Sequence, residues 1–147
     1  AKYPPKVLLL LDFELAAVGD PLTDVAYLAL FYLFPSPKGI ASLTSEHRAN
    51  FPTPDEILDY YCQKSGGYLS ELGASQRSKL LRVYMAAMCH KLAGIAHGVI
   101  VRGLLGNASD AEGAMRLRGS VDLLSRIGCD LLQVKCPPNL SETSKLQ

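Results

Sequence analysis

The sequence predicts a mainly α-helical chain that opens with one short buried β-strand and continues with about four helices. The strand is predicted by the apolar run 7–11, which has no helical period and is typical of a buried strand. The helices are predicted because apolar residues beyond this run recur at helical spacing between turn signals. No second segment has the features of a strand.

The isolated strand indicates that the chain is part of a larger domain. A single strand cannot satisfy its backbone hydrogen bonds in a protein core. We therefore expect its partner to precede residue 1, and residues 1–133 to be the C-terminal part of an α+β parent domain. Residues 134–147 form a polar tail that starts near Pro137 and Pro138, and we expect this tail to be disordered.

The first predicted helix is followed by a long loop. An apolar helix is expected from Pro21 or Asp24 to about Phe34, and an irregular surface loop over 35–53.

The next helix is expected to start after Thr53, whose side chain can form a capping box with Glu56. It should end at about Ser65, before Gly66 and Gly67.

Two further helices are expected in the second half. A long helix covers about 75–105 and stops at Gly106 and Asn107. Its expected core face, at steps of three and four residues, is Leu80, Leu81, Tyr84, Met85, Met88, Leu92, Ile95, Val99 and Ile100. Ser109 and Glu112 match a second capping box, which would open a last helix over about 110–133.

Composition excludes several classes of protein. With 48% hydrophobic and 20% charged residues, the chain is globular rather than disordered. Its formal net charge of +1 and lack of a dense basic cluster argue against a nucleic-acid partner. The longest apolar run, 25–34, is shorter than the about 20 residues that a transmembrane helix needs.

The four cysteines do not form a C-x-x-C pair, and we expect them to be free thiols in a reducing compartment. We therefore expect an intracellular protein, with mitochondrial, peroxisomal and cytoplasmic placement left open.

An acidic residue directly follows the predicted strand. Asp12 ends the run 7–11, and Glu14 lies on the same side of an extended chain two residues later. In kinases an aspartate at this position holds Mg²⁺ against nucleotide phosphates, and Mg²⁺ usually takes one or two protein carboxylates. On spacing alone, an aspartate that ends a strand and opens a turn is the favoured interpretation, and a metal ligand is the alternative.

The segment LLLLDFELAAVGDPLTDVAYLA resembles the aminoglycoside phosphotransferase and choline-kinase-like family, which carries the block D-[FW]-E-x-A-x-x-G-D-P-x-x-D-x-A. The matching residues are Asp12, Phe13, Glu14, Ala16, Gly19, Asp20, Pro21, Asp24 and Ala26. The later stretch KLAGIAHGVIVRGLLGNASDAE, 91–112, resembles the kinase-like domain fused to acyl-CoA dehydrogenases in family members 10 and 11. The resemblance covers about residues 6–133 and implies a parent with a protein-kinase-like fold, of which this chain is the C-lobe part.

The resemblance assigns roles to single residues. It implies that Asp12 binds Mg²⁺ in the intact domain, and that Glu14 contacts a second metal ion or orients the loop. A structural hydrogen bond is an equal alternative for Glu14. Asp24 is expected to brace the catalytic loop, and an aspartate near a helix start also accepts backbone N–H bonds. Gly19, Asp20 and Pro21 form a turn by their chemistry, and Asp20 is a weaker candidate for the cleft.

Polar residues on the long helix form a second candidate site. Lys79, His90 and His97 fall on one stripe at helical spacing, with Arg82 beside it. A solvated face is the favoured interpretation, and a cleft wall for an anionic substrate such as a CoA phosphate is the alternative. His97 and Arg102 are the weaker substrate-binding candidates, and His90 and His97 are too far apart for a zinc pair.

Gly94 and Gly98 lie inside the same predicted helix, where each glycine costs about 1 kcal/mol relative to alanine. We therefore expect a neighbouring helix to approach closely there. A substrate passing over the helix is the alternative.

Taken as a whole, the resemblance implies an ATP-dependent small-molecule phosphotransferase with Mg²⁺ and ATP as cofactors. Its acceptor would be a hydroxyl group, and the best-matching relatives point to a hydroxyacyl-CoA. The family's H-G-D-x-x-x-x-N catalytic loop is absent from this chain, and all three histidines follow Asp12. We therefore expect the missing N-terminal portion of the kinase domain as a partner, and neither turnover nor tight cofactor binding by this chain alone.

Two other interpretations stay open. The chain is a non-catalytic truncated product that acts as a helical interaction module, or it is an unrelated helical binding domain in which the Asp12 block is coincidental. The last leaves the isolated strand unexplained.

Overall fold

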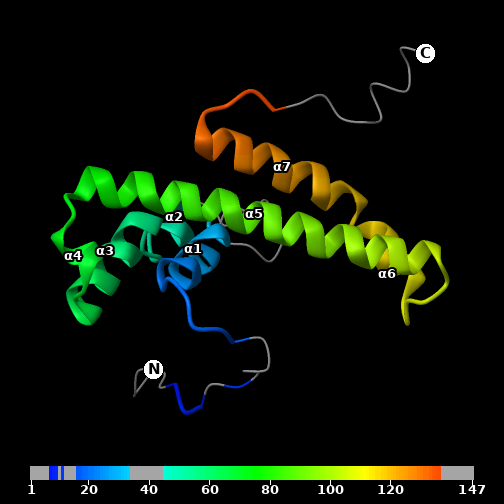
Figure 1. Cartoon of the computed structure of the whole chain (residues 1–147), viewed down its shortest axis with the longest axis horizontal. Helices are drawn as coiled ribbons and strands as arrows, with labels where there is room; N and C mark the ends of the chain where they lie inside the picture. The colour runs from blue at the N-terminus through cyan, green and yellow to red at the C-terminus, as the bar shows by residue number, and fades with distance from the viewer. Residues whose placement is uncertain (1–6, 10, 12–15, 34–44, 137–147) are drawn as a thin grey trace.

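The computed structural model describes residues 7–9, 11, 16–33 and 45–136, and these residues form helices and connecting turns (Figure 1). The prediction of a mainly α-helical chain is therefore confirmed. The helices are α1 (Leu22–Leu30), α2 (Ser45–Arg48), α3 (Pro54–Ser65), α4 (Tyr68–Glu71), α5 (Ala74–Leu104), α6 (Ala111–Arg116) and α7 (Arg118–Leu132).

The buried strand predicted over 7–11 is wrong for the part of it that the structure describes. Residues 7–9 and 11 have no regular secondary structure, and their side chains are 71–92% exposed. A strand is stable only beside another strand, and none occurs in the ranges that the structure describes. The partner strand that we expect before residue 1 stays a prediction.

Helix α5 is the element against which the other long helices pack. α7 runs antiparallel along one side of α5, and α1 and α3 lie on the other (Figure 1). Its buried residues follow helical spacing and are Leu81, Met85, Ala86, Met88, Cys89, Ala96 and Ile100. The predicted core face is therefore confirmed, except at Ile95, which is 53% exposed.

Helix α1 buries one face and exposes the other. Its buried residues are Leu22, Val25, Ala26, Ala29 and Leu30, which is the spacing of an amphipathic helix. Ala26 and Ala29 are fully buried, so their small side chains let α1 approach its neighbours closely. Tyr27 and Phe31 lie exposed on the other face, with their rings edge to face at 5.8 Å.

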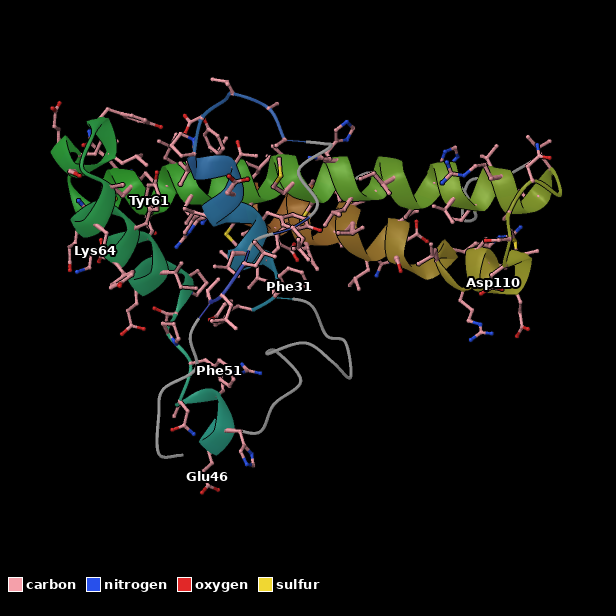
Figure 2. All side chains as sticks on the ribbon, turned by 90° about the horizontal axis from the view of Figure 1, so that it is seen from below. Phe31, Glu46, Phe51, Tyr61, Lys64 and Asp110 are labelled. Carbon is pink, nitrogen blue, oxygen red and sulfur yellow. The ribbon has the colours of Figure 1, made fainter. Side chains whose placement is uncertain are left out.

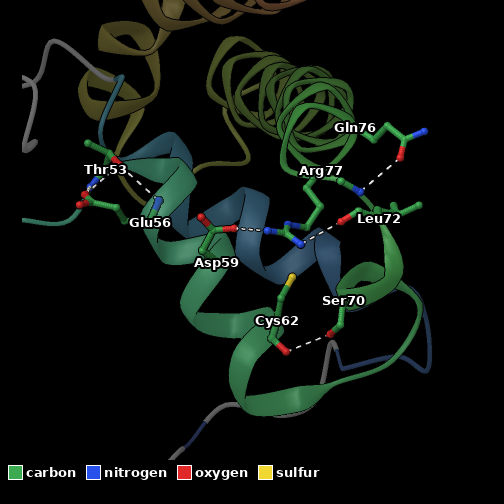
Figure 3. Close-up of polar contacts among 9 residues, drawn as sticks. Thr53, Glu56, Asp59, Cys62, Ser70, Leu72, Gln76 and Arg77 are labelled. Atoms are coloured by element: carbon green, nitrogen blue, oxygen red, sulfur yellow. Dashed lines mark hydrogen bonds and ion pairs between the residues drawn. The ribbon is translucent and has the colours of Figure 1, made fainter.

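The predicted start and end of α3 are both confirmed. The Glu56 N–H donates to the Thr53 hydroxyl at 3.2 Å, and the Thr53 N–H donates to the Glu56 carboxylate at 2.7 Å (Figure 3). This reciprocal pair is a capping box. The helix stops where Gly66 and Gly67 adopt φ angles of 65° and 78°, which favour glycine.

Two short helices were not predicted. α2 lies inside the segment 35–53 that the sequence assigned to a loop, of which residues 35–44 fall outside the described ranges. α4 follows Gly67 directly and buries Leu69. Helices of a single turn lack the repeated apolar period from which a helix is recognised.

The last predicted helix is two helices, α6 and α7, which meet at Leu117. The predicted capping box of Ser109 and Glu112 is wrong. Asp110 caps α6 instead, because its carboxylate accepts the Gly113 N–H at 2.7 Å.

Close approach between helices occurs at a different glycine from those predicted. A Cβ atom on Gly94 or Gly98 would meet no described atom within 4 Å. A Cβ atom on Gly103 would lie 2.7 Å from the Ala114 Cβ, so Gly103 is the position where α5 and α6 need a glycine. The neighbouring helix expected at Gly94 and Gly98 is thus not found among the described residues.

Within the described ranges, α5 is the one helix long and apolar enough to meet the length and composition criteria for a membrane span. Core helices of soluble proteins meet the same criteria, and α5 packs against α1, α6 and α7. The absence of a transmembrane segment stays a prediction.

The end of the chain is described only in part. α7 ends at Leu132, and residues 134–136 have no regular secondary structure. The predicted disorder of 134–147 and the boundary at 133 stay predictions, since 137–147 lie outside the described ranges.

Leu124 tests the packing of α7 on α5. Its side chain is 3% exposed and belongs to the core, so we expect Leu124→Ala to lower the free energy of unfolding by about 2–4 kcal/mol. Leu132, on the same helix, is 46% exposed, and Leu132→Ala should cost under about 1 kcal/mol. Urea unfolding of both variants checks this, and equal losses would contradict the packing.

Candidate functional site

The residues with the strongest predicted roles, Asp12 and Glu14, lie outside the described residues. The structure does describe the end of the loop that follows them, residues 16–20, and the start of α1. The described part of the site therefore consists of residues 16–20 and the residues that contact Asp20.

Asp20 joins three parts of the chain through its carboxylate. Oδ1 accepts the backbone N–H of Leu22 at 2.9 Å, at the start of α1. Oδ2 accepts the hydroxyl of Tyr68, from α4, and the hydroxyl of Tyr84, from α5, each at 2.7 Å. We call Asp20, Tyr68 and Tyr84 the Asp20 clamp.

Local sequence explains why Asp20 takes this position. Pro21 has a φ of −63°, which is already helical, and lacks the N–H that a helix start leaves unbonded. Asp20 then accepts the N–H two residues on, as aspartates do in turns and helix caps. The turn predicted from Gly19, Asp20 and Pro21 therefore works as the cap of α1.

A second set of contacts fixes the helix that carries Tyr68. The Arg77 guanidinium donates to the Asp59 carboxylate at 2.7 Å and to the Leu72 carbonyl at 2.9 Å (Figure 3). The Ser70 hydroxyl donates to the Cys62 carbonyl at 3.0 Å. These bonds join α3, α4 and the start of α5. They therefore fix the position of α4, the helix from which Tyr68 contacts Asp20.

The clamp changes the acidity of its members. Burial raises the pKa of Asp20, but the hydrogen bonds from Tyr68, the Leu22 N–H and Tyr84 outweigh it, and the pKa lies below its usual value. The hydrogen bond to Asp20 raises the pKa of Tyr68 to about 12 and also raises that of Tyr84. At neutral pH the clamp is therefore one carboxylate held by two neutral phenols.

This arrangement suits Asp20 to positioning rather than to metal binding. Its two oxygens already accept three hydrogen bonds, which leaves only one acceptor position of the carboxylate free for a metal ion. The sequence indicates Asp20 only as a weak candidate for the cleft, although an aspartate before Pro21 and an apolar helix is a recognisable cap. Its tyrosine partners are 48 and 64 residues away and carry no such signal.

Asp24 lies exposed in the first turn of α1. The N–H of Leu22 is bonded by Asp20, so the capping bond belongs to Asp20 and not to Asp24. The charge of Asp24 still favours the positive end of the helix dipole. Its predicted bracing of a catalytic loop stays a prediction.

The predicted polar stripe of α5 faces solvent. Lys79, Arg82, His90 and His97 are all exposed, which agrees with the solvated-face interpretation. Arg102 is exposed too and lines an open hollow of about 430 Å³.

The hollow beside Arg102 lies where α5 turns into α6. Asn107, Ser109 and Asp110 contribute polar groups to it, and His97 does not line it. Tyr84 and Arg102 are about 27 Å apart along α5 at 1.5 Å per residue. In Figure 2, Asp110, which also lines the hollow, lies at the opposite end of the molecule from Tyr61 and Lys64. The structure thus keeps Arg102 apart from the Asp20 clamp.

One place in the sequence carries side chains suited to bind a metal ion. Among residues 7–9, 11, 16–33 and 45–136, no group of three or more histidine, cysteine, aspartate or glutamate side chains is arranged to hold a metal ion. The carboxylate oxygens of Asp12 and Glu14 are the ligand type that Mg²⁺ prefers. These two residues stay the predicted ligands.

Replacing Asp20 tests the clamp. We expect Asp20→Asn to lower the free energy of unfolding at neutral pH by about 1–2 kcal/mol, because charged hydrogen bonds are lost from a partly exposed site. A depressed carboxyl pKa stabilises the fold above the unfolded value of 3.8, and this contribution is lost as the pH falls through the lower folded value. The difference between wild type and variant should therefore vanish in acid.

Asp122→Asn is the matched control, since Asp122 is an exposed carboxylate on α7. It should change the unfolding free energy by less than about 0.5 kcal/mol. Titration of tyrosinate absorbance gives a second readout, in which the Tyr68 pKa of about 12 moves back toward 10.0 in Asp20→Asn. An Asp20 variant that behaves like the Asp122 variant in both assays would exclude the clamp.

Comparison with known proteins gives relatives of one kind. The chain is 32% identical to acyl-CoA dehydrogenase family member 11 of Rattus norvegicus over 146 residues, which is 96% of this chain and 18% of the relative. It is 33% identical to the Pongo abelii protein of the same name over 86% of this chain and 15% of that one. It is also 34% identical to acyl-CoA dehydrogenase family member 10 of Mus musculus, over 72% of this chain and 9% of the relative.

No protein-family model matches the chain, and no solved structure matches it. The chain spans less than a fifth of the length of the curated relatives that it matches. The resemblance to members 10 and 11 is confirmed at this level, and the kinase-like assignment stays a prediction. The chain is therefore similar, along most of its own length, to one segment of acyl-CoA dehydrogenase family members 10 and 11.

Proposed function

We propose that residues 1–133 are the C-lobe part of an ATP-dependent phosphotransferase that acts on the hydroxyl group of a small molecule. Asp12 binds Mg²⁺ in the intact domain, and Glu14 contacts the cofactor or orients the loop. The fifteen-position block from Asp12 to Ala26 supports these two assignments.

The observation that carries the proposal is the Asp20 clamp. Asp20 follows Asp12 by eight residues and Glu14 by six, and its carboxylate is bonded to α1, α4 and α5 at once. Phosphoryl transfer depends on positioning and electrostatics more than on covalent chemistry. A loop anchored at its end to three helices is suited to hold a carboxylate in place.

The residues of this chain would supply only part of the chemistry. When bound, Mg²⁺ would neutralise charge on the phosphates of ATP. Asp12 would hold the ion, Asp20 is the positioning residue, and Asp24 lies at the start of α1 beside the clamp. The general base and the second metal ligand belong to the H-G-D-x-x-x-x-N loop, which this sequence lacks.

The proposed acceptor is a hydroxyacyl-CoA. The relatives are named for acyl-CoA, which supports this class of acceptor. Arg102 is an exposed cation in a hollow with the side chains of Asn107 and Ser109, which suits an anionic group on a long substrate.

The test uses the longest product of the locus that contains these residues, with ATP, Mg²⁺ and hydroxyacyl-CoA compounds. We expect transfer of the terminal phosphoryl group to the hydroxyl, and a loss on the order of 100-fold or more in Asp12→Asn. Asp55→Asn is the control, because Asp55 is an exposed carboxylate in the first turn of α3 and should leave the rate unchanged.

The 147-residue chain is assayed beside it and should show no turnover. Transfer that is unaffected by Asp12→Asn would contradict the role of Asp12. ATP hydrolysis by the 147-residue chain that Asp12→Ala abolishes would contradict the need for the missing loop.

A second function is favoured by the exposed apolar surface. Residues 7–9 and 11 and the α1 residues Tyr27, Leu28 and Phe31 are exposed, so the chain suits a non-catalytic helical interaction module. Size-exclusion chromatography separates the two functions. A stable monomer favours a self-sufficient module, and self-association favours a lobe whose partner is missing.

A further inference from the structure

The cysteines divide into two kinds. All four are free thiols, as the sequence predicted. Cys62 and Cys89 are buried in the core, and burial raises the pKa of Cys89 to about 11. Cys129 and Cys136 are partly exposed at the end of the described chain. Thiols of the second kind are open to reagents in solution.

The chain turns back at the end of α7 and brings these two residues together. Gln133 adopts a left-handed conformation with φ 56° and ψ 38°, which ends the helix. The Val134 N–H then donates to the Cys129 carbonyl at 3.0 Å. After this turn the thiols of Cys129 and Cys136 lie within hydrogen-bonding range of each other.

We propose that Cys129 and Cys136 form a reversible disulfide, which makes the end of α7 a redox-sensitive site. The oxidant is a low-molecular-weight disulfide such as oxidised glutathione. Two thiols within hydrogen-bonding range need little backbone movement to bond, whereas distant cysteines need a rearrangement.

The disulfide forms in two exchange steps. One of the two thiols loses its proton to water, and its thiolate displaces one glutathione thiolate to form a mixed disulfide. The other thiol then loses its proton and attacks the protein sulfur of the mixed disulfide, and the second glutathione leaves as a thiolate. Both glutathione thiolates take up a proton. Two protein thiols and one glutathione disulfide thus give one protein disulfide and two glutathione thiols.

The bond would act on the packing of α7. Ile127 and Leu131, which flank Cys129 on this helix, pack against the core. A disulfide to Cys136 closes the last turn of α7 covalently. Oxidation would therefore hold the end of α7 against α5, and reduction would leave it held by the turn alone.

The test treats the folded 147-residue chain with oxidised glutathione and follows it by thiol alkylation and peptide mass spectrometry. We expect loss of two of the four alkylatable thiols, with Cys129 linked to Cys136 while Cys62 and Cys89 stay reduced. In Cys129→Ser, one glutathione should remain on Cys136. In Cys136→Ser, no internal disulfide should form.

A shifted cysteine supplies the matched control. The double variant Lys135→Cys, Cys136→Ser keeps the number of thiols and moves one of them by a residue, so closure should be at least about tenfold slower. Hydrogen exchange of the Val134 amide gives a readout of the fold, and it should slow on oxidation. Equal closure by the shifted variant, a stable glutathione adduct on the wild type, or pairing of Cys129 with Cys62 or Cys89 would overturn the proposal.

Discussion

The carboxylate of Asp20 is the interaction on which the site depends. It caps α1, binds a phenol on α4 and binds a phenol on α5, so one charged group fixes the relative positions of three helices. The same residue follows Asp12 by eight positions and Glu14 by six in the sequence. A change at Asp20 therefore acts on the packing of three helices and on the described residues 16–19 that precede it.

Helix α5 sets the limits of what the described part of the chain can do. It supports α1 and α7 along its length, and it separates the Asp20 clamp from the hollow beside Arg102 by about 27 Å. A single compact site would not include both the Asp20 clamp and this hollow, whereas a long acceptor would reach both. Residues 7–9 and 11 and the exposed face of α1 are apolar surfaces too, and no neighbour covers them in the described structure.

Sequence patterns predicted the features that depend on local chemistry. The capping box of Thr53 and Glu56, the stop at Gly66 and the core face of α5 all follow from propensity and helical spacing. The predictions that were wrong depend on contacts distant in sequence. The strand 7–11 needed a partner strand, the close contact is at Gly103 rather than at Gly94, and Asp20 gains its tyrosines from two other helices. The Asp12 block, by contrast, carries a signal that the described residues do not test.

The central claim, that this chain is the C-lobe part of a phosphotransferase, is tested most directly upstream of Ala1. Mapping the 5′ end of the transcript gives the sequence that precedes the chain. If the chain is such a C-lobe part, we expect an upstream H-G-D-x-x-x-x-N loop in the same reading frame, which would supply the base and the second metal ligand. A message that begins at this chain would contradict it, and Asp12 would then be a remnant in a protein that works by binding.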